Sequence, residues 1–155
     1  LGASAEIMQH FDKSIVGGDK WLMQLGTLSG NPIAAAAGLK TMEVLRREGS
    51  YDRLREIGRA LQDMQSSALN AADIPHQICG DETLFDIFFT TSQCRDYRTA
   101  KHDDPARNAT YNATLRQHGI FKSPGKLYPS LAITSNDLEQ TKAAVKHAVR
   151  SISLS

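Results

Sequence analysis

One stretch constrains this chain most: Gly26-Thr27-Leu28-Ser29-Gly30-Asn31-Pro32, which runs directly into Ile33-Ala34-Ala35-Ala36-Ala37-Gly38-Leu39. Asn31 suits a helix N-cap, and Pro32 suits the first helical position because its missing N–H is not needed there. The alanines that follow are strong helix formers. The stretch therefore predicts a helix that begins at Pro32.

The residues ahead of this helix can supply donors to an anion. Two glycines, together with Thr27 and Ser29, offer backbone N–H groups and two hydroxyls near the positive end of the helix dipole. The alternative is a loop whose polar groups only cap the helix. The residues by themselves leave both interpretations open.

The string Gly-Thr-Leu-Ser-Gly-Asn-Pro before an alanine-rich helix closely resembles the class III (ω-type) pyridoxal-phosphate aminotransferases. Within them it resembles the glutamate-1-semialdehyde aminomutase-like branch. The resemblance runs from about Leu1 to Ile152, and it is strongest over 26–54 and again at Asp96-Tyr97, Lys101 and 119–124.

This resemblance implies a cofactor and a shared active site. In the family the threonine of the motif, here Thr27, contacts the phosphate of pyridoxal 5'-phosphate in the neighbouring subunit, and Gly26 lets the backbone come close. The resemblance thus implies a homodimer. It also places Trp21 and Gln24 beside the active site as pocket lining, although Trp21 fits a packing role equally well.

The chemistry of such enzymes also needs a Schiff-base lysine and an acid partner for the pyridine nitrogen. The lysines of this chain, such as Lys13, Lys20, Lys122 and Lys126, do not match the family's lysine motif, which is expected upstream of Leu1. We assign none of them as catalytic. The chain therefore resembles a C-terminal piece: 1–31 end the large cofactor-binding domain with its phosphate-binding loop, and 32–155 form a connecting helix and the small C-terminal domain.

The hydrophobic periodicity predicts an α+β fold. Helices come first and strands interleaved with helices follow, which indicates a short-stranded sheet covered by helices, as in the small domain of fold-type I pyridoxal-phosphate transferases. The expected helices cover 32–48, 50–71 with Ser50 as cap, 105–118 with Asp104 as cap, and about 135–152; the expected strands cover 75–79, 84–91, 120–123 and 127–133.

The segment around Tyr128 bears on the reaction type. Between Pro124 and Ser130 the aminomutase pattern normally has a longer segment with an acidic residue, which this sequence lacks. This favours an aminotransferase that moves an amino group between an amino acid or amine and a keto acid or aldehyde. Tyr128 is expected on the substrate side, and a packed or half-exposed strand tyrosine is the alternative. A semialdehyde aminomutase and a non-catalytic remnant that dimerises or binds a partner stay open.

Charge and composition exclude some classes of partner. Lys and Arg number 18 against 17 Asp and Glu, with no block of one sign, which argues against a nucleic-acid or membrane-surface partner. Without a long apolar run or a secretory leader, we expect a cytoplasmic protein. Cys79 and Cys94 stand without a second pair and the histidines lack metal-ligand spacing, so we expect two reduced thiols and no metal site.

Overall fold

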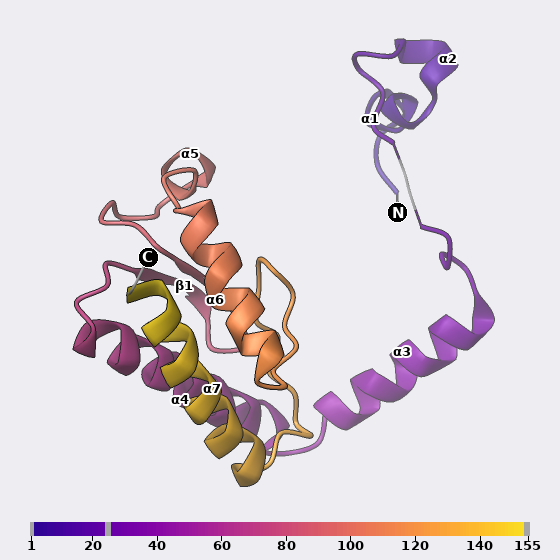
Figure 1. Ribbon diagram of the computed structural model, residues 1–155. Coiled ribbons are helices and arrows are strands. Elements are labelled where there is room, and N and C mark those ends of the chain that lie inside the picture. Colours follow the sequence, from indigo (N-terminus) through magenta and orange to yellow (C-terminus); the bar gives the residue numbers. More distant parts are fainter. Residues whose placement is uncertain (1, 24–25, 154–155) are drawn as a thin grey trace. The chain divides into compact units, whose positions relative to one another are not determined.

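The computed structural model of the protein describes residues 2–23 and 26–153 of the 155-residue chain (Figure 1). By its internal contacts the chain divides into two compact units, Leu1–Val44 and Leu45–Ser155, which are described separately. Gln24, expected beside the active site, lies outside the described residues.

The first unit is helical. Its elements are α1 (Ala5–Met8), the 3-10 helix η1 (Gln9–Phe11), α2 (Lys13–Val16) and α3 (Pro32–Leu45). The predicted start of α3 is confirmed, because Asn31 Oδ1 accepts hydrogen bonds from the N–H groups of Ile33 at 2.9 Å and Ala34 at 3.1 Å. The helix ends at Leu45, three residues before the expected end. The turn that follows it contains Gly49, which has a positive φ of 76°.

Helix α3 presents apolar side chains on its surface. None of its residues is buried, and Ile33 and Leu39 are 79% and 69% exposed. The sequence predicts an apolar stripe along this helix, and the stripe contributes nothing to the core of the unit that contains it. It is therefore an uncovered apolar surface of the described chain.

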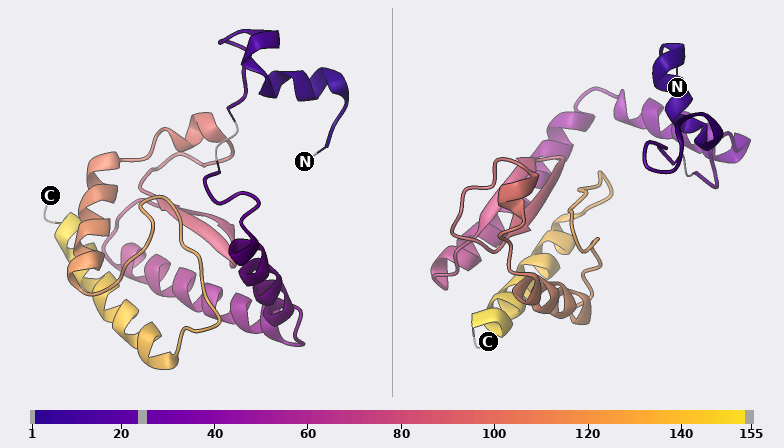
Figure 2. Two further views of the ribbon diagram at one scale, coloured as in Figure 1. Left: turned by 90° about the vertical axis from the view of Figure 1, so that its right-hand side faces the viewer. Right: turned by 90° about the horizontal axis from the view of Figure 1, so that it is seen from above.

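The second unit is an α+β fold, as predicted. Helices α4, α6 and α7 pack together, with α7 between α4 and α6, and a two-stranded hairpin lies along α4 (Figures 1 and 2). Its elements are α4 (Ser50–Ala71), β1 (Gln77–Asp81), β2 (Leu84–Phe88), α5 (Tyr97–Ala100), α6 (Pro105–Gln117) and α7 (Ser135–Ser153).

The hairpin has one face in the core and one face away from it. The strands are antiparallel, with Ile78 opposite Ile87 and Cys79 opposite Asp86. Because side chains alternate along a strand, Ile78 and Ile87 share the face that packs on the helices, and Cys79 and Asp86 share the other. The core between hairpin and helices includes Leu69, Phe85, Ile87, Phe89, Tyr111, Leu115, Val145, Ala148 and Ile152.

A glycine allows α4 to approach the hairpin closely. A Cβ atom built on Gly58 would lie 1.9 Å from the carbonyl oxygen of Glu82 in the hairpin turn. No side chain fits there, so the glycine in the middle of α4 permits backbone contact between the two elements.

Two local predictions are wrong in detail. Ser50 is the first helical residue of α4 and Gly49 takes the N-cap position. Met64 and Ala68, which continue the helical spacing of Leu61, are half-buried and pack against the core, and Gln65 and Leu69 next to them are buried.

The expected strands at 120–123 and 127–133 are reduced to two isolated bridges, Ser123 to Lys126 and Leu127 to Phe85. Pro124 and Pro129 interrupt this segment, and a proline cannot donate to a ladder. None of the helices in residues 2–23 and 26–153 is both long enough and apolar enough to cross a membrane.

Candidate functional site

The loop before α3 is held by its own backbone. The N–H of Ser29 donates to Gly26 O at 3.0 Å, and the N–H of Asn31 donates to Leu28 O at 3.1 Å, so two successive turns lead into the helix. Gly30 lies between them at φ 78°, a conformation that favours glycine. The glycine-rich sequence is thus used for a tight reversal directly in front of α3.

The donors that remain in this loop are few and identifiable. Asn31 already saturates the first N–H groups of α3 through its side chain, so the helix terminus itself offers little to an anion. Thr27 is exposed, and within residues 2–23 and 26–153 its hydroxyl forms no hydrogen bond. Its hydroxyl and nearby loop N–H groups form a donor set suited to a phosphate oxygen.

Trp21 packs within the first unit. Its Nε1–H donates to the carbonyl oxygen of Phe11 at 3.2 Å, and the Lys13 ammonium lies 5.5 Å from the centroid of its ring. These contacts tie the segment before the motif to η1 and α2. They match the packing role that the sequence left open for this residue.

Tyr128 lies in the second unit and 64% of its surface is exposed. It belongs to none of the described strands. The residue borders a recess of about 240 Å³ whose other walls include Leu61, Phe121, Lys122, Lys126, Ile133 and Thr141. A small polar ligand is compatible with walls that combine apolar, hydroxyl and ammonium groups.

Two charged residues near this recess were not assigned to a site from the sequence. Burial lowers the pKa of Lys122, whose ammonium donates to the carbonyl oxygens of Ser123 at 3.0 Å and Pro124 at 3.3 Å. Burial raises the pKa of Asp86, which faces Lys122 from β2. A Cβ on Gly125 would lie 3.9 Å from Asp86 Oδ2, so a carboxylate does stand beside the segment in which the sequence lacks one.

Strand alternation is the signal that could have found Asp86. It interrupts the apolar run of β2 at an outward position, between Phe85 and Ile87. Nothing in the sequence signals the burial of Lys122, because that depends on the path of the segment after α6.

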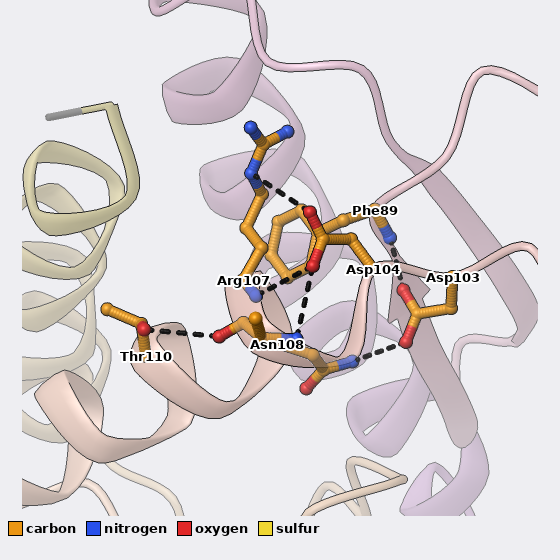
Figure 3. Close-up of polar contacts among 7 residues, drawn as sticks. Phe89, Asp103, Asp104, Arg107, Asn108 and Thr110 are labelled. Atoms are coloured by element: carbon orange, nitrogen blue, oxygen red, sulfur yellow. Dashed lines mark hydrogen bonds and ion pairs between the residues drawn. The ribbon is translucent and has the colours of Figure 1, made fainter. Parts of the chain in front are cut away.

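Hydrogen bonds join the residue that follows β2 to the residues that precede α6, and we call this set of contacts the polar clamp (Figure 3). One carboxylate oxygen of Asp103 accepts from the N–H of Phe89 at 2.6 Å, and the other accepts from Asn108 Nδ2 at 3.1 Å. The next residue, Asp104, donates its own N–H to Phe89 O at 3.1 Å. The residues from 90 to 102, including α5, therefore form an excursion whose two ends are fixed together.

The expected site residues divide between the two units. Gly26 and Thr27 belong to the first and Tyr128 to the second. Within the described ranges, no three His, Cys, Asp or Glu side chains gather as a set of metal ligands.

The fold is similar to those of solved aminotransferases, although no family model matches the sequence. An ω-transaminase from Sphaerobacter thermophilus has a TM-score of 0.70 and 28% identity over 97% of this chain and 34% of its own. A β-phenylalanine aminotransferase from Variovorax paradoxus has a TM-score of 0.66 and 25% identity over 94% of this chain and 33% of its own.

A further transaminase, solved with PLP bound, shares the fold at 20% identity, with a TM-score of 0.66 over 95% of this chain. The similarity therefore includes nearly all of this chain and about one third of each of these enzymes. The chain has the fold of one third of an aminotransferase.

Proposed function

We propose that this chain is the C-terminal part of a class III aminotransferase that uses pyridoxal 5'-phosphate, of the branch that includes glutamate-1-semialdehyde aminomutase. The single observation that carries the proposal is the match to the ω-transaminase over 97% of the chain at 28% identity. The Gly26–Pro32 motif adds to it independently, since a general α+β fold does not require that string.

The proposed contribution of the first unit is to hold the cofactor phosphate. The exposed hydroxyl of Thr27 donates to a phosphate oxygen, and Gly26 allows the backbone to approach. Ser29 and Asn31 keep the loop in shape, because their N–H groups are already used within it. When bound, the cofactor supplies the electron sink that amino-group transfer requires.

The proposed domains follow from this. Residues 1–31 complete the cofactor-binding domain, and 32–155 supply the connecting helix and the small domain. The exposed recess beside Tyr128 supports a role for that residue on the substrate side, where its hydroxyl orients an amino donor or a keto acid or aldehyde acceptor.

A homodimer is part of the proposal, with Thr27 acting on the cofactor of the neighbouring subunit. The exposed apolar residues of α3, which directly follows the phosphate loop, support it because a surface of this kind is normally covered. We further propose a cytoplasmic location.

The test replaces Thr27 in the full-length enzyme. Thr27→Val removes a charge-assisted hydrogen bond worth about 1.5 to 3 kcal/mol, so the dissociation constant for pyridoxal 5'-phosphate is expected to rise roughly ten- to a hundredfold. Thr27→Ser keeps the hydroxyl and should bind nearly as well as the parent. Ser29→Ala is the matched control in the same loop, and an equal loss there would show that loop shape, rather than Thr27, is being measured.

A covalent readout separates the open alternatives. After incubation with pyridoxal 5'-phosphate and borohydride, the 155-residue chain should gain no cofactor mass, whereas the longer enzyme should gain one cofactor at one lysine. Labelling of a lysine in the short chain would refute our assignment of the catalytic lysine to another segment. No labelling of the longer protein would favour the non-catalytic remnant.

The semialdehyde aminomutase remains a second candidate because the Asp86 carboxylate stands beside Gly125. A mutase would convert a semialdehyde without any keto-acid acceptor, and an aminotransferase would not.

A further inference from the structure

The two cysteines of the chain meet on the outer face of the hairpin. Cys79 lies in β1 on the face away from the helices, and Cys94 lies in the excursion between β2 and α5. The Cys79 thiol lies 4.0 Å from the carbonyl oxygen of Cys94, and the Cys94 thiol lies 3.9 Å from the carbonyl oxygen of Ser92. Two cysteines that are 15 positions apart in the sequence are thus neighbours in the fold.

The clamp described above fixes this approach. The excursion leaves β2 at Phe89 and returns at Asp103, and these two residues are hydrogen-bonded to each other (Figure 3). Within it, Ser92 N–H donates to Thr90 Oγ1 at 3.1 Å, and Asp96 caps α5 by accepting from Thr99 N at 2.8 Å. Cys94 therefore lies in a segment whose two ends are hydrogen-bonded to each other and whose backbone forms local hydrogen bonds before and after the cysteine.

Both thiols are half-buried, and neither carries a disulfide in the structure. Burial raises the pKa of Cys79, and the neighbouring Cys94 and Asp86 raise it further. Cys79 is consequently the weaker entry point for an incoming disulfide, since the thiolate is the attacking species.

We propose that Cys79 and Cys94 form a redox-responsive dithiol that closes to an intramolecular disulfide by exchange with a small disulfide such as oxidised glutathione. The Cys94 thiolate attacks one glutathione sulfur, the sulfur–sulfur bond of glutathione breaks, and one glutathione thiolate leaves. The Cys79 sulfur then attacks the Cys94 sulfur and expels the second glutathione. Two electrons pass to one oxidised glutathione, and the two cysteine protons end on the two reduced glutathiones.

The consequence of closure is a covalent tie between β1 and the excursion that carries α5. Both cysteines belong to the second unit, whereas the Gly26–Pro32 loop belongs to the first. The proposal therefore does not depend on cofactor binding.

The test is a redox titration of the purified protein with mixtures of reduced and oxidised glutathione, read by intact mass after acid quenching. We expect a species about two mass units lighter, without glutathione, and an effective concentration of the dithiol at least about tenfold higher in the folded protein than in urea. In the 155-residue chain, which has 2 cysteines, the product is unambiguous.

Equal effective concentrations with and without urea would overturn the proposal, because chain connection alone would then explain closure. Stable glutathione adducts on the folded parent, or disulfide-linked dimers, would also overturn it.

Single variants test the order of attack. Cys79→Ser should stop with one glutathione on Cys94, and Cys94→Ser should react more slowly at Cys79. Equal rates in the two variants would contradict the assignment of Cys94 as the entry thiol. Circular dichroism of both variants establishes that they are folded.

Discussion

Tyr111 and Gln65 share a hydrogen bond inside the apolar core, with the phenol O–H donating to Gln65 Oε1 at 3.3 Å. Each residue is only 1% exposed, and Gln65 Nε2 donates in turn to Leu61 O at 2.8 Å. The ring of Tyr111 also meets Phe89 edge to face, with centroids 5.4 Å apart. This polar link joins α4 to α6 inside the apolar core.

Removing this donor should destabilise the second unit. Tyr111→Phe leaves Gln65 Oε1 buried without a partner, so the free energy of unfolding should fall by about 1 to 3 kcal/mol in urea denaturation. Tyr51→Phe is the control, since Tyr51 is 49% exposed on the same helix bundle and should change stability little. If Tyr111→Phe combined with Gln65→Met loses more than Tyr111→Phe alone, the cause is packing rather than an orphaned acceptor.

The same residue gives a pH dependence with a defined sign. Burial raises the pKa of Tyr111 well above its usual value of 10.0. The unfolded chain therefore loses the phenol proton at a lower pH than the folded chain, so the stabilisation is complete below pH 10 and is lost as pH rises beyond it. The stability difference between the parent and Tyr111→Phe should shrink above pH 10. A difference that stays constant there would contradict a buried phenol.

Helix α6 should depend on its cap. Asp104 Oδ1 accepts from the N–H groups of Ala106 at 3.1 Å and Arg107 at 3.0 Å (Figure 3). Asp104→Ala should lower the free energy of unfolding by about 1 kcal/mol, measured by chemical denaturation. Asp104→Asn retains the acceptor and should recover most of the loss. Asp104 also forms an ion pair with Arg107, with 3.9 Å between Oδ2 and Nε, and equal losses in both variants would point to this ion pair instead.

Gly58→Ala should be destabilising although alanine favours helices. The new methyl group would meet Glu82 O, and the shift that follows is expected to cost about 1 to 3 kcal/mol, more than the gain of about 1 kcal/mol in helix propensity. Gly38→Ala in α3 is the matched control, because a Cβ there meets nothing within 4 Å. Thermal melts followed by circular dichroism would compare the two, and a stabilised Gly58→Ala would refute the close contact.

These residues mark what the sequence can and cannot predict. The caps Asn31 and Asp104 are predictable, because their partners lie two or three positions away and the chemistry is local. The burial of Gln65 is not, because its partner Tyr111 comes 46 residues later. From the sequence alone, Gly58 is predicted only to weaken its helix, because its close contact with the hairpin exists only in the fold.

The candidate site divides in the same way. The motif around Thr27 is recognisable as a string, and the structure adds that Asn31 has already used the helix terminus. Asp86 and Lys122 gain their surroundings from segments that meet only in the fold, and so do the two cysteines. The strands expected around Pro124 and Pro129 illustrate a different error. Apolar residues favour a strand there, but the prolines leave too few backbone donors to build one.

The clamp between Phe89 and Asp103 makes the chain from 90 to 102 a cassette. Because its two ends are hydrogen-bonded to each other, a change in the length of this segment changes the entropy cost of loop closure only a little. The start of α6 is fixed by the clamp and does not depend on the sequence of the segment. Engineers could shorten or exchange the cassette while the helical core stays intact. Such a segment can change in sequence and length without a redesign of its support.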